Sequence, residues 1–204
     1  MLISAHNIKF KLYKVKSINF MRNMLSKIAT TPNNIVTKKD VLASDANLVD
    51  VGKSLKNKVN KLFNGSLAIR QVAAGSDNSC EQELVALGNS FYDVERFGIR
   101  FVASPRHADM LLVTGPVARN MAAALKSAYD ATPDPKIVVA VGDGAIDGGI
   151  WKGNYAVEDG VNAVIPVDYQ IPGDPPEPID ILHALLNIME DIELKSNKLR
   201  QDGK

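Results

Sequence analysis

Apolar residues recur along this chain with two different periods. Short apolar runs bounded by Gly, Pro or charged residues predict buried strands at residues 67–73, 99–103, 110–114, 137–141 and 163–167. Helical patterns fall between or after them, at residues 81–87, 117–129 and 179–198. Alternating strands and helices require crossover connections. We therefore expect an α/β fold: a flavodoxin-like three-layer sandwich with a parallel sheet covered on both faces.

A further amphipathic helix is predicted ahead of the first strand, at residues 45–64. Apolar residues recur there at spacings of three and four, with lysines between them, at Leu48, Val51, Leu55, Val59 and Leu62. Gly65 ends the pattern, because glycine readily adopts the left-handed conformation that stops a helix. We expect this helix to pack on the domain or on a partner protein.

The beginning of the chain is basic. Eight Lys and Arg residues precede the first acidic residue, Asp40. We interpret residues 1–44 as a flexible basic extension, with Met21 and Met24 as alternative starts; an organelle-targeting peptide is the competing interpretation. The α/β domain is expected to occupy residues 65–195, followed by a polar tail at residues 196–204.

Composition narrows the functional classes. The chain has 204 residues, 46% of them hydrophobic, which suits one core, and its net charge of +1 gives no electrostatic case for binding nucleic acid. Cys80 is the single cysteine, so an internal disulfide is excluded and a reducing compartment is expected. No apolar run reaches the roughly 18 residues that cross a bilayer, so we expect any membrane contact to be peripheral. Motifs of serine hydrolases, zinc enzymes and phosphate-binding loops are absent.

The loops after four predicted strands are expected to meet at one place. They comprise residues 75–81, 115–116, 142–149 and 168–178 and are rich in Gly, Pro and Asp. In parallel sheets, such loops converge at the carboxyl ends of the strands, where ligands bind. The sequence therefore predicts a site at this edge.

Four stretches of the sequence carry a family resemblance: SLAIRQVAAGSDNSCEQEL, YDVERFGIRFVASPRHADMLLVTGPV, ATPDPKIVVAVGDGAIDGGIW and VIPVDYQIPGDPP. They closely resemble the 20 kDa-type small subunit shared by respiratory complex I (NADH dehydrogenase), formate hydrogenlyase, hydrogenase-4-like complexes and other energy-converting [NiFe] hydrogenases. The resemblance covers residues 66–186 and is weaker back to Met21.

This resemblance implies a 4Fe-4S cluster held by four cysteines on the converging loops. The corresponding positions here are Asp77, Cys80, Gly144 and Asp174, so one thiolate is present among four positions. Iron-sulfur clusters require soft thiolate ligands, and glycine has no side chain to offer. We therefore expect that the family cluster is not bound, and that the protein is a structural or redox-modified small subunit. The alternative is an electron-transfer subunit with an atypical cluster on Asp77, Cys80 and Asp174.

A different occupant of this site is a second hypothesis. Asp77, Cys80 and Asp174, with Asp143 and Glu81 nearby, would form a divalent-metal or proton site if they were clustered away from water. The competing interpretation is a loop that has opened to water, in which these residues are ordinary solvated acids.

The resemblance also implies partners. They are a large, catalytic-type subunit that houses quinone or the [NiFe] centre, and membrane-arm subunits, with the protein lying peripherally on the cytoplasmic face of the inner membrane. Residues expected near the large subunit are Glu95, Arg96, Arg106, His107 and Asp109. The alternative for Arg106 and Asp109 is that they fix the turn between two strands. A free-standing binding protein, detached from any complex, is the third functional reading.

Overall fold

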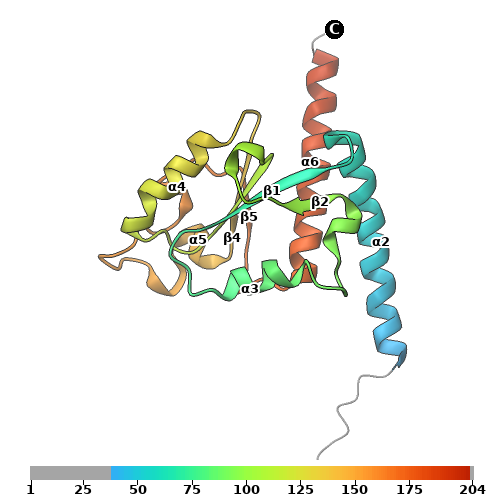
Figure 1. The fold of residues 1–204 in the computed structure, drawn as a ribbon, viewed down its shortest axis with the longest axis horizontal. Helices are drawn as coiled ribbons and strands as arrows, with labels where there is room; N and C mark the ends of the chain where they lie inside the picture. Colours follow the sequence, from blue (N-terminus) through green and yellow to red (C-terminus); the bar gives the residue numbers. More distant parts are fainter. Residues whose placement is uncertain (1–37, 203–204) are drawn as a thin grey trace, which may run out of the picture. The chain divides into compact units, whose positions relative to one another are not determined.

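The structure, a computed structural model, describes residues 38–202, and side chains at residues 47–198 (Figure 1). Its centre is a five-stranded sheet in the order β2-β1-β3-β4-β5, with every neighbouring pair parallel. The strands are β1 (Leu67–Ala73), β2 (Ile99–Phe101), β3 (Met110–Thr114), β4 (Ile137–Val141) and β5 (Tyr169–Ile171). This order is the flavodoxin-like one, so the expected fold class is confirmed.

Helices cover both faces of the sheet. Figure 1 shows α4 (Arg119–Ala131) and α5 (Asp143–Asp147) on one side, and α2 (Lys38–Phe63), α3 (Ser79–Ala86) and α6 (Pro178–Asp202) on the other. Four short 3-10 helices lie in the connections of the described region: η1 (Val94–Phe97), η2 (Pro105–His107), η3 (Gly149–Trp151) and η4 (Val161–Ala163). The described part of the chain therefore has three layers.

Alternation along the central strands builds two hydrophobic cores. In β3, Met110 and Leu112 pack towards α2, α3 and α6, whereas Leu111 and Val113 pack towards α4 and α5. All four side chains are fully buried. Successive side chains of a strand point to opposite faces, so a strand covered on both sides must be apolar throughout. The continuous apolar runs of β3 and β4 meet this requirement.

Most predicted elements are found, and one strand was wrong. Strands β1, β3 and β4 have the predicted bounds, and β2 ends two residues earlier than predicted. Residues 163–167 do not form a strand: the last strand, β5, follows them at Tyr169–Ile171. Val161 and Ile165 are buried in the core beside α4 and α5, which explains the apolar character of that segment without a strand. Helix α5 was expected as loop.

Helix α2 begins earlier than the predicted residue 45. The chain divides into a compact unit, Ala43–Lys204, and a preceding unit, Met1–Leu42, of which the structure describes helical residues 38–42 alone. Residues 38–44 are thus helical, and residues 1–37 lie outside the described region, so the flexible extension stays a prediction. At the other end, α6 continues to Asp202, so the expected polar tail is largely helical. Among the described helices, none is long and apolar enough to cross a bilayer.

Candidate functional site

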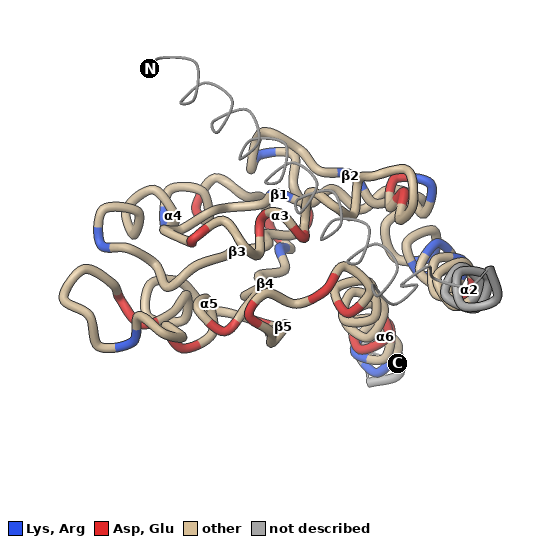
Figure 2. Tube along the Cα trace, turned by 90° about the horizontal axis from the view of Figure 1, so that it is seen from below, with Lys and Arg blue, Asp and Glu red and all other residues tan. Residues whose placement is uncertain are grey.

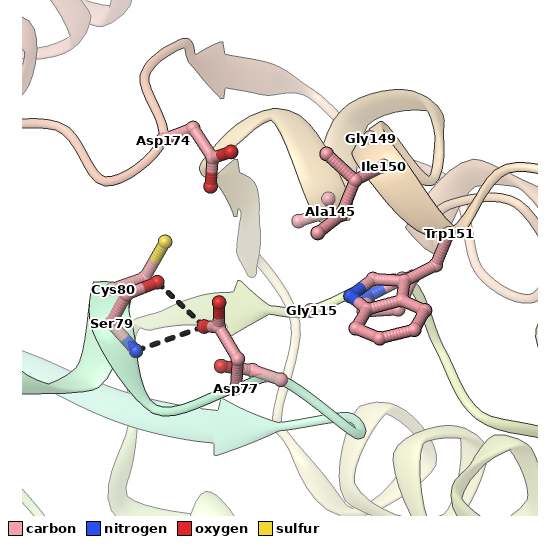
Figure 3. Close-up of a pocket in the computed structure, with 12 residues that line it drawn as sticks. Asp77, Ser79, Cys80, Gly115, Ala145, Gly149, Ile150, Trp151 and Asp174 are labelled. Atoms are coloured by element: carbon pink, nitrogen blue, oxygen red, sulfur yellow. Dashed lines mark hydrogen bonds between the residues drawn. The ribbon is translucent and has the colours of Figure 1, made fainter.

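A pocket lies at the carboxyl edge of the sheet, as the loop positions predict. Residues from the loops after β1, β3, β4 and β5 line it, together with α3, α5 and η3 (Figure 3). All four positions singled out by the family resemblance, Asp77, Cys80, Gly144 and Asp174, are among them. The cavity measures about 30 Å³, which is room for one or two water molecules. The fold therefore brings the four positions together.

Asp77 is held by its own loop. Its Oδ1 accepts hydrogen bonds from the Ser79 backbone N–H at 3.0 Å and from Ser79 Oγ at 2.6 Å, as the dashed lines in Figure 3 show. These bonds stabilise the charged carboxylate and lower the pKa of Asp77. The residue is exposed. Asp77 thus shapes the turn before α3, and its charge is solvated.

Cys80 is placed differently, in the first turn of α3. It is buried, and its thiol points to the side of the pocket where Asp174 lies (Figure 3). A Cβ atom added to Gly142 would lie 2.4 Å from Cys80 Sγ, so the sulfur packs directly against the backbone at the end of β4. Burial raises the pKa of the Cys80 thiol to about 11. At neutral pH, Cys80 is therefore a protonated thiol.

The other two positions lie on loops that are joined by hydrogen bonds. Gly173 N–H donates to Asp143 Oδ1, and Asp143 N–H donates to Gly173 O, both at 2.9 Å. This exchange fixes Asp174 relative to α5, which contains Gly144. Asp174 is exposed, like Asp77. Asp77 and Asp174 therefore line the same pocket and both remain exposed to water. This exposure is what the interpretation of them as solvated acids requires.

Glu81 is the acid that is buried. Its carboxylate accepts hydrogen bonds from Ser76 Oγ and from Thr114 Oγ1, and Thr114 is fully buried. These bonds connect α3 to the loop after β1 and to the end of β3. A buried carboxylate must be hydrogen-bonded to be tolerated. Glu81 therefore stabilises the pocket wall, a role that sequence analysis did not assign; the polar Thr114 ending an otherwise apolar strand was the available signal.

The side chains present do not fit a 4Fe-4S cluster. The chain has one cysteine, its thiol is buried against Gly142, and the Asp77 carboxylate is turned to Ser79. A cluster of this type requires four ligands, normally thiolates. Within residues 47–198, whose side chains the structure describes, no group of three or more His, Cys, Asp or Glu side chains is arranged to hold a metal ion. The metal site on Asp77, Cys80 and Asp174 remains a prediction.

The five residues expected at a subunit interface fall into separate places. Arg96 lies 4.7 Å from the centre of the Phe97 ring and pairs with Asp93 at 4.0 Å, while Glu95 is exposed beside it in η1. Asp109 Oδ2 accepts the backbone N–H of Ala68 at 2.9 Å, so Asp109 fixes the start of β3 against β1. Asp109 therefore has a structural hydrogen bond, and its predicted place at a subunit interface stays a prediction. Arg106 and His107 are exposed in η2.

Two apolar side chains stand at the pocket. Ile150 is 77% exposed and Trp151 is 47% exposed, and both line the cavity (Figure 3). Both side chains leave apolar surface exposed at the pocket.

Comparison with known proteins identifies the family. Residues 78–188 match the family model described as NADH ubiquinone oxidoreductase, 20 Kd subunit. An uncharacterized protein of Methanocaldococcus jannaschii is 45% identical over 66% of this chain and 91% of its own length. A probable membrane-bound hydrogenase subunit of Pyrococcus furiosus is 41% identical over 65% of this chain and 79% of its own length.

A solved structure agrees with these matches. It is that of the membrane-bound sulfane sulfur reductase, an archaeal respiratory membrane complex, and one of its chains superposes with a TM-score of 0.58. The sequence identity is 35%, and the match covers 69% of this chain and 76% of that chain. Fold and sequence agree, and the chain belongs to the family of the 20 kDa subunit of NADH:ubiquinone oxidoreductase.

Proposed function

We propose that this protein is a structural small subunit of a membrane-associated complex related to complex I and to membrane-bound hydrogenases, and that it does not itself carry electrons. Its family, and the relatives that are a membrane-bound hydrogenase subunit and a chain of a respiratory membrane complex, support the assignment to such a complex. In this proposal it lies peripherally, on the cytoplasmic face of the inner membrane.

The proposal that the protein does not carry electrons rests on the chemistry of the pocket side chains. The four loop positions face one cavity, yet they offer a glycine, two solvated carboxylates and a protonated thiol. Carboxylate oxygen is a hard ligand and suits iron-sulfur clusters poorly. The fold of an electron-carrying subunit is therefore kept while its ligand set is not.

Its partners in this proposal are a large, catalytic-type subunit and membrane-arm subunits. Exposed Ile150 and Trp151, which stand at the pocket, would be covered by the large subunit, as would Glu95, Arg106 and His107. The protein would then bridge the two parts. The alternative function is that of a subunit that binds an atypical cluster or another metal ion. The pocket supports this alternative because Asp77, Cys80 and Asp174 line it together, so such a group would bind there.

The test is purification of the full-length protein from its native membranes under anaerobic conditions, with identification of co-purifying subunits and measurement of iron and acid-labile sulfide. We expect a large subunit and membrane subunits to co-purify, and isolated full-length protein without iron. Stoichiometric iron and sulfide in the isolated chain would disprove the redox-silent role. Recovery as a monomer from the membranes would disprove the assignment to a complex.

A variant with four cysteines serves as the positive control for the expected absence of iron in the natural chain. The substitutions Asp77→Cys, Gly144→Cys and Asp174→Cys restore four cysteines, and a Cβ at Gly144 would meet its nearest neighbour, Pro116 Cδ, at an ordinary 3.7 Å. After reconstitution with iron and sulfide, this variant should bind about four irons per chain and turn brown, whereas the natural chain should not. Adding Cys80→Ser to the variant should lower the iron content again. Equal iron binding by the natural chain would contradict the proposal.

A further inference from the structure

The second half of strand β1 has an open edge. Strand β2 pairs with β1 at Leu67, Ala68 and Ile69 and ends at Phe101, while β1 continues to Ala73. The last hydrogen bond on this side runs from Val102 N–H to Ile69 O at 2.8 Å. In the described part of the chain, no strand follows β2 along the remaining residues of β1.

The backbone groups at this edge belong to Gln71 and Ala73. On the other side of β1, Ala74 N–H donates to Thr114 O at 2.9 Å, and Val72 O accepts from Thr114 Oγ1 at 3.5 Å. Successive residues of a strand direct their backbone groups to alternate neighbours. Gln71 and Ala73 therefore direct their N–H and C=O groups away from β3, to the side where β2 has ended.

A groove lies beside these groups. Arg70, Gln71 and Ala73 line one side of it and Phe101, Val102 and Ala103 the other, and it measures about 400 Å³. Phe101 is 36% exposed, so its ring is available to a second molecule. An open strand edge beside an apolar ring is the arrangement that binds extended peptide segments by strand addition.

The positive charges around the groove indicate that an acidic peptide segment would bind there. Arg96 and Arg119 have carboxylate partners within 4.0 Å, but Arg70, Arg100 and Arg106 have none among the described side chains. Arg70 and Arg100 point to the same face of the sheet, since Arg100 is in register with Ala68, two residues before Arg70. Figure 2 shows Lys and Arg positions around β2. The carboxylate of Asp109 nearby already accepts the Ala68 N–H.

We propose that a short, extended, acidic segment of a partner protein adds as a strand to β1 at Gln71–Ala73, with its carboxylates on Arg70 and Arg100. The exposed edge is about three residues long, so the segment is short. The chain's own beginning suits the groove poorly, because residues 1–39 contain eight Lys and Arg and no acidic residue. The inference fits a subunit of a complex, but its test does not depend on that function.

The test measures residue-resolved amide hydrogen exchange of the full chain with a defined peptide of alternating glutamate and valine. Binding should slow exchange at Gln71 and Ala73 at least about tenfold, whereas Val72, whose amide faces β3, should not change. The same peptide with lysine in place of glutamate should not bind. Arg70→Glu should weaken peptide binding at least about tenfold. Lys126→Glu, an equal charge change on exposed α4, should have an effect below about twofold.

Several outcomes would overturn the proposal. Equal binding of the lysine peptide would show that acidic side chains are not required. A lack of protection at Gln71 and Ala73 would show that the segment does not add to β1 as a strand. Protection of these amides by anionic phosphatidylglycerol vesicles, and not by the peptide, would assign the arginines to a membrane surface. Slow exchange at both amides in the full chain alone would show that the chain covers its own edge. None of these outcomes alters the iron measurement that tests the proposed function.

Discussion

The sulfur of Cys80 occupies the place where a side chain at Gly142 would begin. A Cβ atom at Gly142 would lie 2.4 Å from Cys80 Sγ, and Gly142 has a φ of +88°, which side chains rarely adopt. Helix α3 and the end of β4 therefore meet at a contact between a thiol and a bare backbone. Because both partners are small, the helix and the strand end approach closely.

Replacing Gly142 should destabilise the protein for two reasons. Gly142→Ala adds a methyl group against Cys80 Sγ and forces alanine to a φ of +88° with a ψ of 154°, a combination that essentially only glycine adopts, so we expect a loss of about 2 to 4 kcal/mol in the free energy of unfolding. Urea denaturation measures it. Cys80→Ala in the same chain removes the clashing sulfur, so the double variant should be more stable than the sum of the single effects predicts, by about 1 kcal/mol or more.

A second glycine shows what a positive φ alone costs when no side chain is in the way. Gly153 has a φ of +76°, and a Cβ there would meet nothing within 4 Å. Gly153→Ala should cost only about 1 kcal/mol, the price of the backbone conformation alone. If Gly142→Ala cost no more than Gly153→Ala, the close contact with Cys80 would be refuted.

Cys80 should react slowly with thiol reagents. Burial raises the pKa of this thiol to about 11, and the thiolate is the reactive species. Compared with an unperturbed cysteine, the thiolate fraction at pH 8 falls by about a hundredfold. Alkylation of the native chain should therefore be at least that much slower than in urea, and its rate should rise with pH up to about 11. Rapid native labelling at pH 8 would show that the loop opens in solution.

The sequence predicted the strands with partners on both sides and the start of the edge strand β2, but missed the other edge strand, β5. Strands β3 and β4 are buried on both faces, so their apolar runs are unmistakable. Strand β5 is three residues long, contains the polar Gln170 and pairs with β4 alone. Its position is fixed by pairing with Val139–Val141, a long-range contact that no local pattern reports. Residues 163–167 are more apolar and fit the strand pattern better, although in the structure they pack against the core without forming a strand.

The location of the candidate site could also be predicted, but not the state of its side chains. The order of strands and loops was enough to place residues 77, 80, 144 and 174 around one pocket. Whether the acidic side chains of Asp77 and Asp174 are buried or solvated depends on the direction in which each side chain points, which the order of strands and loops does not determine. Asp77 turns to Ser79, two residues away, and this local hydrogen bond competes with any ligand in the pocket.

Thr114 should be required for the stability of buried Glu81. Thr114→Val keeps the shape of the side chain but removes the hydroxyl that donates to Glu81. The buried carboxylate then keeps Ser76 as a donor and loses the other, so we expect a loss of about 1 to 3 kcal/mol in the free energy of unfolding. Ser127→Ala is the control, because exposed Ser127 bonds only to a helix carbonyl; it should change stability by less than about 0.5 kcal/mol. Equal effects would mean that Glu81 does not depend on Thr114.

An ion-pair network joins helices α2 and α6. Glu193 accepts hydrogen bonds from both Lys58 and Lys61, and Glu190 lies 3.9 Å from Lys58. The hydrogen bonds from Lys58 and Lys61 lower the pKa of Glu193 to about 2, from an ordinary value of 4.5. A carboxylate with a lowered pKa in the folded state stabilises that state above its ordinary pKa. The contribution disappears as pH falls towards the folded value.

Glu193→Gln should therefore lower the melting temperature at pH 7, and the difference from the natural chain should shrink as pH falls from about 4.5 to about 2. The pair is at the surface, so the difference should also shrink in 1 M salt. Glu190→Gln is the matched control: Glu190 is a more exposed acid on the same helix and lies farther from Lys58, so its effect should be smaller at every pH. Thermal unfolding followed by circular dichroism across this pH range measures both. A Glu193→Gln effect that stayed constant between pH 7 and pH 2 would show that lost packing, and not the charge on Glu193, explains the change.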